Sequence, residues 1–371
     1  MPLINGKTGP MPSFGYRAAL PALAAAMIIA AGTLTGVWGI APARADDTAD
    51  WKLCAGDKAD EVIASCTRLL AGKLEAKNEV TALGNRGWAY NEKGDYDKAL
   101  ADYTSCLKVA PTNDYCMSEL SDTYNLRKDY DKAIEAADAA IKNNPKSEYA
   151  NYVKGFALFK KGDLDGAIAS FSTSADLNPR FAKAYFLRGQ VEASKQDYAA
   201  AIADDNKALA INADYDDARA ARGFSQYNLG KLDAALADLD TVITRNPKDA
   251  WTLGIRGSVF MAKGNDAKAL ADFDAALAVD ATADWMYTPR GMANFHLKKF
   301  ADAILDFQHA VTAYPGSIEA NAYLGLALVE TGKKDEAKAP LHGALDSKAR
   351  TDDERKAQKL ALDKLTELGV N

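Results

Sequence analysis

Histidine is scarce in this sequence of 371 residues, which contains only His296, His309 and His342. These residues are scattered, so they form no cluster for a metal ion or for His-based catalysis. The sequence also has no Ser/His/Asp or Cys/His set and no glycine-rich phosphate loop. Acidic residues such as those at 214–217 are interpreted as a solvated turn. We therefore expect a protein that is not an enzyme and needs no metal and no cofactor.

A surplus of basic residues is also missing. The chain has 45 Lys and Arg against 51 Asp and Glu, which gives a formal net charge of −6. Proteins that bind nucleic acid neutralise its phosphates with a basic stripe. We therefore expect no nucleic-acid partner.

Residues 1–45 are predicted to be a signal peptide. Lys7 and Arg17 precede the apolar stretch AALPALAAAMIIAAGTLTGVWGI, and ARA puts small residues at positions −3 and −1 of a cut after Ala45. The apolar run is about 20 residues long, so a retained membrane anchor is the alternative. Translation beginning at Met11 is a further alternative. We expect export to the periplasm of a Gram-negative bacterium, or anchoring in the inner membrane facing it.

Cysteine is rare, and the four cysteines form two close pairs, Cys54 with Cys66 and Cys106 with Cys116. Disulfides persist in oxidising compartments, so the expected export favours two local disulfides. Free buried thiols are the alternative.

A period of 34 residues organises the rest of the chain. Eight blocks without insertion or deletion begin at residues 80, 114, 148, 182, 216, 250, 284 and 318. Positions within a block are called slots here and are counted from its first residue. Slot 20 is Ala in all eight blocks, slot 8 is Gly in seven, and slot 32 is Pro in five. Periods of 20 to 50 residues are typical of repeat arrays.

Each block is predicted to form two helices. The first presents slots 4, 7, 8 and 11 on one face, and the second presents slots 20, 24 and 27, which is the spacing of a buried helical stripe. The motif KGD between them supplies a Gly that ends the first helix and an Asp that can cap the second. The proline in slot 32 ends the second helix.

The blocks resemble the tetratricopeptide repeat. The residues that carry the resemblance are Gly87, Tyr90, Ala99, Tyr103 and Pro111, then Gly155, Ala167, Phe171 and Pro179, and later Gly291, Ala303, Phe307 and Pro315. The resemblance implies an all-α, right-handed α-solenoid of about eight repeats over residues 80–351. Residues 46–79 are expected to form a degenerate repeat at the N-terminal end. Residues 352–371 are expected to form a capping helix with Ala357, Ala361, Leu365 and Leu368 on its buried face.

The resemblance also implies a concave wall, made by the first helices, that binds an extended peptide or a partner's helix. Its slots 2, 5, 9 and 12 are rich in aromatic residues, and such patches usually bind a partner. The alternative is that many of these rings fill gaps between first helices. The candidate partner-binding residues are Trp88, Tyr115, Tyr149, Tyr152, Phe156, Phe159, Phe186, Phe224, Tyr227, Trp251, Trp285 and Phe295.

Arginine in slot 7 coincides with aspartate in slot 23 of the same block. Blocks that lack the arginine lack the aspartate too, so we predict structural salt bridges between the two helices of a repeat. The predicted pairs are Arg86 with Asp102, Arg188 with Asp204, Arg222 with Asp238, Arg256 with Asp272, and Arg290 with Asp306.

These observations together predict a protein- or peptide-binding scaffold or adaptor in the cell envelope. A glycan- or lipid-handling module is the alternative, because aromatic platforms also stack on sugars. A membrane contact is expected only if the N-terminal segment is retained.

Overall fold

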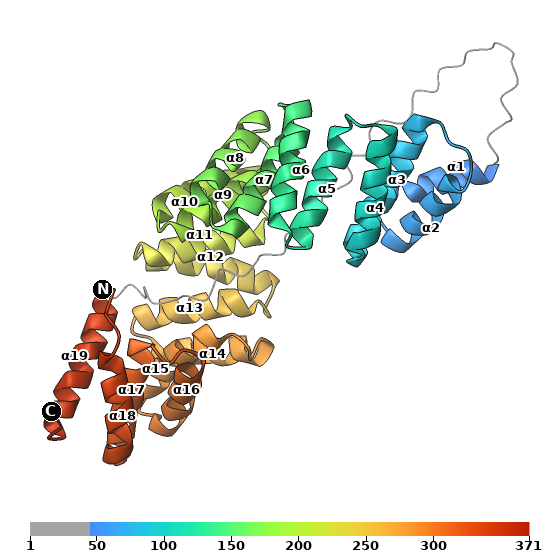
Figure 1. Ribbon diagram of the computed structural model, residues 1–371. Coiled ribbons are helices and arrows are strands. Elements are labelled where there is room, and N and C mark those ends of the chain that lie inside the picture. The colour runs from blue at the N-terminus through green and yellow to red at the C-terminus, as the bar shows by residue number, and fades with distance from the viewer. Residues whose placement is uncertain (1–44, 371) are drawn as a thin grey trace, which may run out of the picture. The chain divides into compact units, whose positions relative to one another are not determined.

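The computed structural model describes residues 45–370, and over this range it contains helices and no strand (Figure 1). The expected all-α fold is therefore confirmed. None of the helices in this range is long and apolar enough to cross a membrane. The predicted signal peptide lies outside the described residues.

The chain divides after Val191 into two compact units. In the first, consecutive helices pack on one another as pairs along the chain. Its helices are α1 (Ala45–Cys54), α2 (Ala59–Leu70), α3 (Ala76–Lys93), α4 (Tyr96–Val109), α5 (Asp114–Leu126), α6 (Tyr130–Asn143), α7 (Glu148–Lys161), α8 (Leu164–Leu177) and most of α9 (Ala182–Ser194).

The second unit contains the end of α9 and the helices that follow it, again packed as consecutive pairs. These are α10 (Tyr198–Ile211), α11 (Asp216–Asn228), α12 (Leu232–Arg245), α13 (Ala250–Ala262), α14 (Asp266–Val279), the 3₁₀ turn η2 (Asp284–Met286), α15 (Tyr287–His296), α16 (Phe300–Ala313), α17 (Ile318–Glu330), α18 (Lys334–Leu345) and α19 (Asp352–Glu367). The helix pairs follow the 34-residue spacing of the sequence.

A left-handed residue in slot 15 ends the first helix of every block. Five blocks use glycine there, with φ between 72° and 86°, and glycine adopts this conformation without a steric penalty. The other three blocks use Lys128, Gln196 and Lys298, with φ of 65°, 66° and 60°. The left-handed turn therefore forms even where slot 15 holds lysine or glutamine, which disfavour this conformation.

The expected aspartate cap forms in only some of the repeats. The side chains of Asp163 and Asp197 accept a hydrogen bond from the backbone N–H three residues on. The expectation is wrong for Asp95, whose side chain makes no such cap bond. Its carboxylate instead pairs with Lys98 at 3.0 Å, because a lysine stands three residues on where Asp163 has a glycine.

The glycine of slot 8 makes room for the large residue of slot 24. A Cβ built on Gly87 would lie 2.8 Å from the Tyr103 ring, and one on Gly291 would lie 2.7 Å from Phe307. Tyr103 and Phe307 are fully buried, as is the alanine of slot 20 in every repeat. The recurring glycine therefore admits a large side chain from the second helix and is not only a point of close helix approach.

Four of the five predicted salt bridges form inside their repeats. The shortest N–O distances are 2.7 Å for Arg86–Asp102, 2.6 Å for Arg222–Asp238, 2.7 Å for Arg256–Asp272 and 2.5 Å for Arg290–Asp306. The fifth, Arg188 with Asp204, would join residues of the two units and stays a prediction. Hydrogen bonding to Asp102 raises the pKa of the Arg86 guanidinium. Burial raises the pKa of Asp306 although Arg290 opposes the change, so desolvation offsets much of the attraction.

The arginines also reach back to the second helix of the preceding repeat, which the sequence comparison missed. Nη1 of each arginine donates a hydrogen bond to an oxygen on that helix. The bonds are Arg86 to Thr67 at 3.1 Å, Arg188 to Ser172 at 2.8 Å, Arg222 to Asn206 at 2.6 Å, Arg256 to Asp240 at 2.7 Å, and Arg290 to Asp274 at 3.1 Å. Arg86, Arg222, Arg256 and Arg290 therefore each tie together three helices and two repeats.

Both predicted disulfides form, and the described residues contain no free cysteine. Cys54–Cys66 joins α1 to α2, and Cys106–Cys116 joins α4 to α5. At the other end, α19 packs on α17 and α18 and buries Ala357, Ala361 and Leu365. The first end is thus covalently closed, whereas the last is closed by packing.

Candidate binding surface

The aromatic residues expected on the first-helix wall differ widely in exposure. Tyr152, Phe186, Phe224, Tyr227 and Trp251 are buried, with 3–9% of each side chain accessible. Trp88, Tyr149, Phe156, Phe159, Trp285 and Phe295 are half-buried, and Tyr115 is 42% exposed. The buried group favours the alternative in which rings fill space between helices.

Packing between neighbouring helices explains the burial. The Phe224 and Trp251 rings lie 5.8 Å apart and share a core with Tyr227, Leu239 and Val242. The Tyr152 ring lies 5.0 Å from that of Phe181. These rings bury large apolar areas within their own units, so they stabilise the array directly.

Two glycines on the wall leave room for aromatic residues from the first helix of the following repeat. A Cβ on Gly84 would lie 3.1 Å from the Tyr115 ring, and one on Gly254 would lie 2.6 Å from Trp285. Both pairs combine slot 5 of one block with slot 2 of the following block. An aromatic ring thus lies across the face of the preceding helix in both places.

Phe156 and Phe159 form a half-buried patch on α7, covered by a lysine. The Nζ of Lys160 lies 5.2 Å from the centre of the Phe156 ring and 5.5 Å from that of Phe159. Burial lowers the pKa of Lys160. The patch therefore already carries a cation, whose attraction to the rings is about 0.5–2 kcal/mol for each ring.

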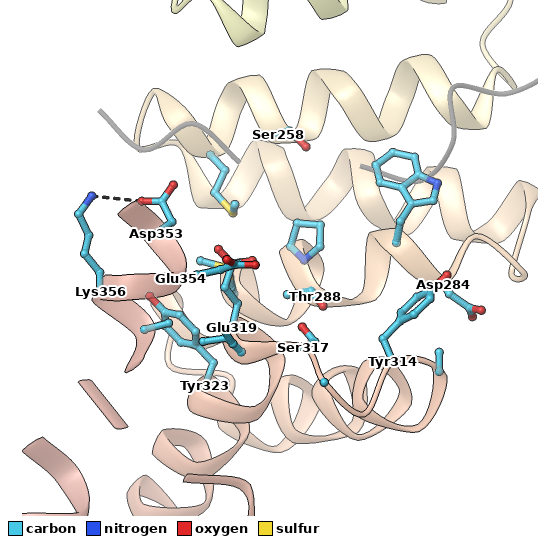
Figure 2. A pocket seen from close by; sticks show the side chains of 18 of the residues that line it. Ser258, Asp284, Thr288, Tyr314, Ser317, Glu319, Tyr323, Asp353, Glu354 and Lys356 are labelled. Atoms are coloured by element: carbon cyan, nitrogen blue, oxygen red, sulfur yellow. Dashed lines mark hydrogen bonds and ion pairs between the residues drawn. The ribbon is translucent and has the colours of Figure 1, made fainter. Parts of the chain in front are cut away.

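The second unit contains a cavity of about 650 Å³ on the first-helix face (Figure 2). Residues from α11, α13, η2, α15, α17 and α19 line it. Among them are residues in slots 2, 5, 9 and 12, which are the slots expected to face the wall. The lining includes Tyr227, Ile255, Ser258, Met261, Asp284, Trp285, Thr288, Pro289, Met292, His296, Tyr314, Glu319, Tyr323, Arg350, Asp353, Glu354 and Lys356.

Acidic side chains dominate the charge around this cavity. Figure 2 shows Glu319, Asp353 and Glu354 close to Tyr323, with Asp284 and Tyr314 across the pocket. Burial, and then the charges of Asp353 and Glu354, raise the pKa of Glu319 to about 7. The site therefore holds more negative charge than its own bases neutralise.

The basic residues of the lining form ion pairs with acidic residues other than Glu319. Lys356 pairs with Oδ1 of Asp353 at 3.1 Å, and its side chain is 62% exposed. Arg350 lies 3.5 Å from Glu354 and is 71% exposed. Glu354 also accepts hydrogen bonds from the backbone N–H groups of Arg350 and Thr351 in a capping box at the start of α19. Neither base neutralises Glu319.

Two buried polar atoms of the lining have no hydrogen-bond partner among the described residues. They are Oη of Tyr227 and Oδ2 of Asp353. Tyr227 is only 4% exposed, and burial, with the charges of Asp353 and Glu319, raises the pKa of its hydroxyl. Buried polar groups are nearly always paired, so two unpaired atoms on one cavity are informative.

The aromatic count identified Tyr227 and Trp285 of this cavity but missed its acids. Glu319 stands in slot 2 of the last block, a wall slot, so its position could have been recognised from the period. Asp353 and Glu354 lie after the last repeat, where no slot exists. Only the assembled structure brings α19 against the first-helix face.

Comparison with known proteins places these features in a family. A tetratricopeptide repeat model matches residues 80–113, and a second such model matches residues 124–179, 152–217 and 220–284. These matches together cover more than half of the chain. No match was found among curated proteins.

Solved structures share the fold at low sequence identity. A chain of the APC/C hetero-tetramer Cut9-Hcn1 is 17% identical with a TM-score of 0.60, over 82% of this chain and 59% of that one. This chain thus spans less than two thirds of that protein's length. A tetratricopeptide repeat protein from Parabacteroides merdae ATCC 43184 is 19% identical with a TM-score of 0.51, over 67% and 99%. PilW, a widely conserved type IV pilus biogenesis factor, is 20% identical with a TM-score of 0.52, over 57% and 98%.

Proposed function

Because the chain belongs to the tetratricopeptide repeat family, we propose that it is a non-enzymatic scaffold or adaptor that binds a protein or an extended peptide. The observation that carries the proposal is the cavity on the first-helix face of the second unit, lined by residues of the wall slots. Concave sites with apolar walls and a few placed polar groups are where proteins bind their ligands. The half-buried Phe156 and Phe159 offer a second contact area in the first unit.

We propose that the scaffold acts in the cell envelope after export. The two disulfides support an oxidising compartment. The sequence of the first 45 residues supports removal of a signal peptide. N-terminal sequencing of the protein purified from its host is expected to begin at Asp46. A chain that retains residues 1–45 would instead indicate a membrane anchor.

Photo-crosslinking tests the binding face. A photoreactive phenylalanine analogue is placed at Thr288, which lines the cavity, and at Asp302, which is exposed on the second helix α16. In the native envelope fraction we expect crosslinks to protein from position 288 and not from position 302. Equal crosslinking from both positions would contradict the proposed face. Crosslinks to polysaccharide or lipid alone would support the alternative module.

The aromatic patch of the first unit is tested separately. A Phe156→Ala, Phe159→Ala variant is expected to lose partner capture by about tenfold if these rings are contact residues. Circular dichroism checks that the variant remains folded. Unchanged capture by a folded variant would confine binding to the second unit.

A further inference from the structure

We propose that the cavity of the second unit receives the ammonium group of a lysine side chain presented by the protein partner. The proposal rests on the proposed function, because it assumes that the partner is a protein. Three oxygen-bearing groups carry it: the Glu319 carboxylate, Oδ2 of Asp353 and Oη of Tyr227. All three belong to residues that line one cavity.

These oxygen-bearing groups lack a hydrogen-bond donor among the residues that the structure describes. Oη of Tyr227 and Oδ2 of Asp353 are buried without a hydrogen-bond partner in the described part of the chain. Glu319 forms no hydrogen bond or ion pair within residues 45–370. A buried oxygen left unpaired destabilises the folded chain. A ligand that donates to these oxygens recovers this free energy on binding.

The charge of the site selects a cation. Burial, and then the charges of Asp353 and Glu354, raise the pKa of Glu319. A carboxylate or phosphate ligand would meet this repulsion, whereas a cation removes it. The nearby bases Lys356 and Arg350 are largely exposed and pair with Asp353 and Glu354, so they do not supply the missing charge.

The number of acceptors suits an ammonium better than a guanidinium. An ammonium carries three donors around one nitrogen, whereas a guanidinium spreads five donors over a plane and suits a bidentate carboxylate. The three groups of the cavity come from separate elements, α11, α17 and α19. Apolar side chains such as Met261, Pro289 and Met292 complete the lining and can cover the aliphatic stem of a lysine.

Titration calorimetry with short capped peptides tests the proposal on the purified protein. The probes are acetyl-Ala-Leu-Lys-Leu-Ala-amide and the same peptide with norleucine or arginine in place of lysine. The free diamine 1,5-diaminopentane is the fourth probe. We expect the lysine peptide to bind at least tenfold more tightly than the norleucine peptide, and more tightly than the arginine peptide or the diamine.

Variants locate the binding in the cavity. Glu319→Gln is expected to weaken the lysine peptide by at least tenfold, and Tyr227→Phe by about threefold to tenfold. Glu330→Gln removes the same charge from the exposed end of α17 and is the matched control, expected to leave the affinity unchanged. Because the hydroxyl of Tyr227 has no partner, Tyr227→Phe is expected not to lower stability. This separates a binding defect from a folding defect.

The number of protons released on peptide binding is a second measurement. A glutamate with a purely structural role would not affect it. With a pKa of about 7, Glu319 is half protonated at pH 7. Lysine binding therefore releases up to about half a proton at that pH, which calorimetry in two buffers of different ionisation enthalpy detects. Glu319→Gln is expected to abolish the release.

Four results would overturn the proposal. They are equal binding of the lysine and norleucine peptides, tighter binding of the arginine peptide, binding of the diamine alone, and no binding of any probe at millimolar concentration. In each case, crosslinks to protein from position 288 would still support the scaffold. Conversely, selective lysine binding without protein crosslinks would leave the cavity chemistry standing and refute the scaffold.

Discussion

Removing Arg86 alone is expected to destabilise the first repeat strongly. Arg86 donates through Nε to Oδ2 of Asp102 at 2.8 Å and through Nη2 to Oδ1 at 2.7 Å. Asp102 is 5% exposed, so Arg86→Leu leaves a carboxylate buried without its cation. Breaking one side of a buried pair costs about 3–5 kcal/mol. The hydrogen bond to Thr67 is lost as well.

Removing both partners is expected to restore most of this loss. The second block already has Leu120 and Ala136 in the slots of Arg86 and Asp102, and its helices pack as the others do. Arg86→Leu with Asp102→Ala therefore recreates a combination that the array accommodates. We expect the double variant to lie within about 2 kcal/mol of the wild type, because an intact buried pair contributes little net stability.

Urea unfolding at pH 7, followed by far-ultraviolet circular dichroism, measures these changes. Repeat arrays need not unfold in one step, so hydrogen exchange of the amides in α3 and α4 is measured in parallel. Equal losses in the single and double variants would refute the pairing argument.

Arg222→Leu tests whether the loss of stability depends on how many cations contact the aspartate. Its aspartate, Asp238, keeps a second cation, because Nη1 of Arg219 lies 3.7 Å from Oδ1. The loss is therefore expected to be smaller than for Arg86→Leu. A larger loss would mean that the charge of the aspartate does not determine the cost.

Three further outcomes follow from the structure. Lys128→Gly is expected to raise the free energy of unfolding by about 1 kcal/mol, since Lys128 is left-handed, and Gly94→Ala in the same slot to lower it similarly; unchanged urea midpoints would contradict this. Glu319→Gln is expected to stabilise the protein by up to about 3 kcal/mol at pH 8 and by almost nothing near pH 4.5, because with a folded pKa of about 7 against an ordinary 4.5 the cost of ionising Glu319 builds up as the pH rises from about 4.5 to 7. A pH-independent effect in urea unfolding would exclude this cause. Replacing Cys106 and Cys116 by alanine, the pair found in the same slots one block on, is expected to cost about 2–3 kcal/mol in the same assay, and thiol counting on the denatured, unreduced wild type is expected to find no free thiol.

The period of 34 residues was sufficient to predict the helical fold and the contacts inside a repeat. Comparing eight copies of one slot reveals which residue types change together, and this identified the partner of Arg86 as Asp102. The same comparison did not reveal that Arg86 reaches back to Thr67. That contact depends on how the second helix of one repeat lies against the next repeat, and the residue types there vary.

The binding surface was predictable only in part, for a related reason. The slots indicated which side of each first helix faces the wall, and two of the residues named for it, Tyr227 and Trp285, line the cavity. They did not distinguish an exposed ring such as Tyr115 from a buried one such as Phe224, because that depends on the neighbouring helix. Asp353 lies beyond the periodic region and had no counterpart for comparison.

The position of α19 links occupancy of the cavity to the stability of this helix. A helix that packs on its neighbours along one side only opens more readily than an enclosed one, and α19 packs on α17 and α18. Asp353, Glu354 and Lys356 lie in the first turns of α19 and line the cavity. Any molecule that binds these residues holds the last helix in place, so binding and order of the C-terminal end are thermodynamically linked. Proteolysis or hydrogen exchange of this one helix thereby becomes a gauge of whether the cavity is filled.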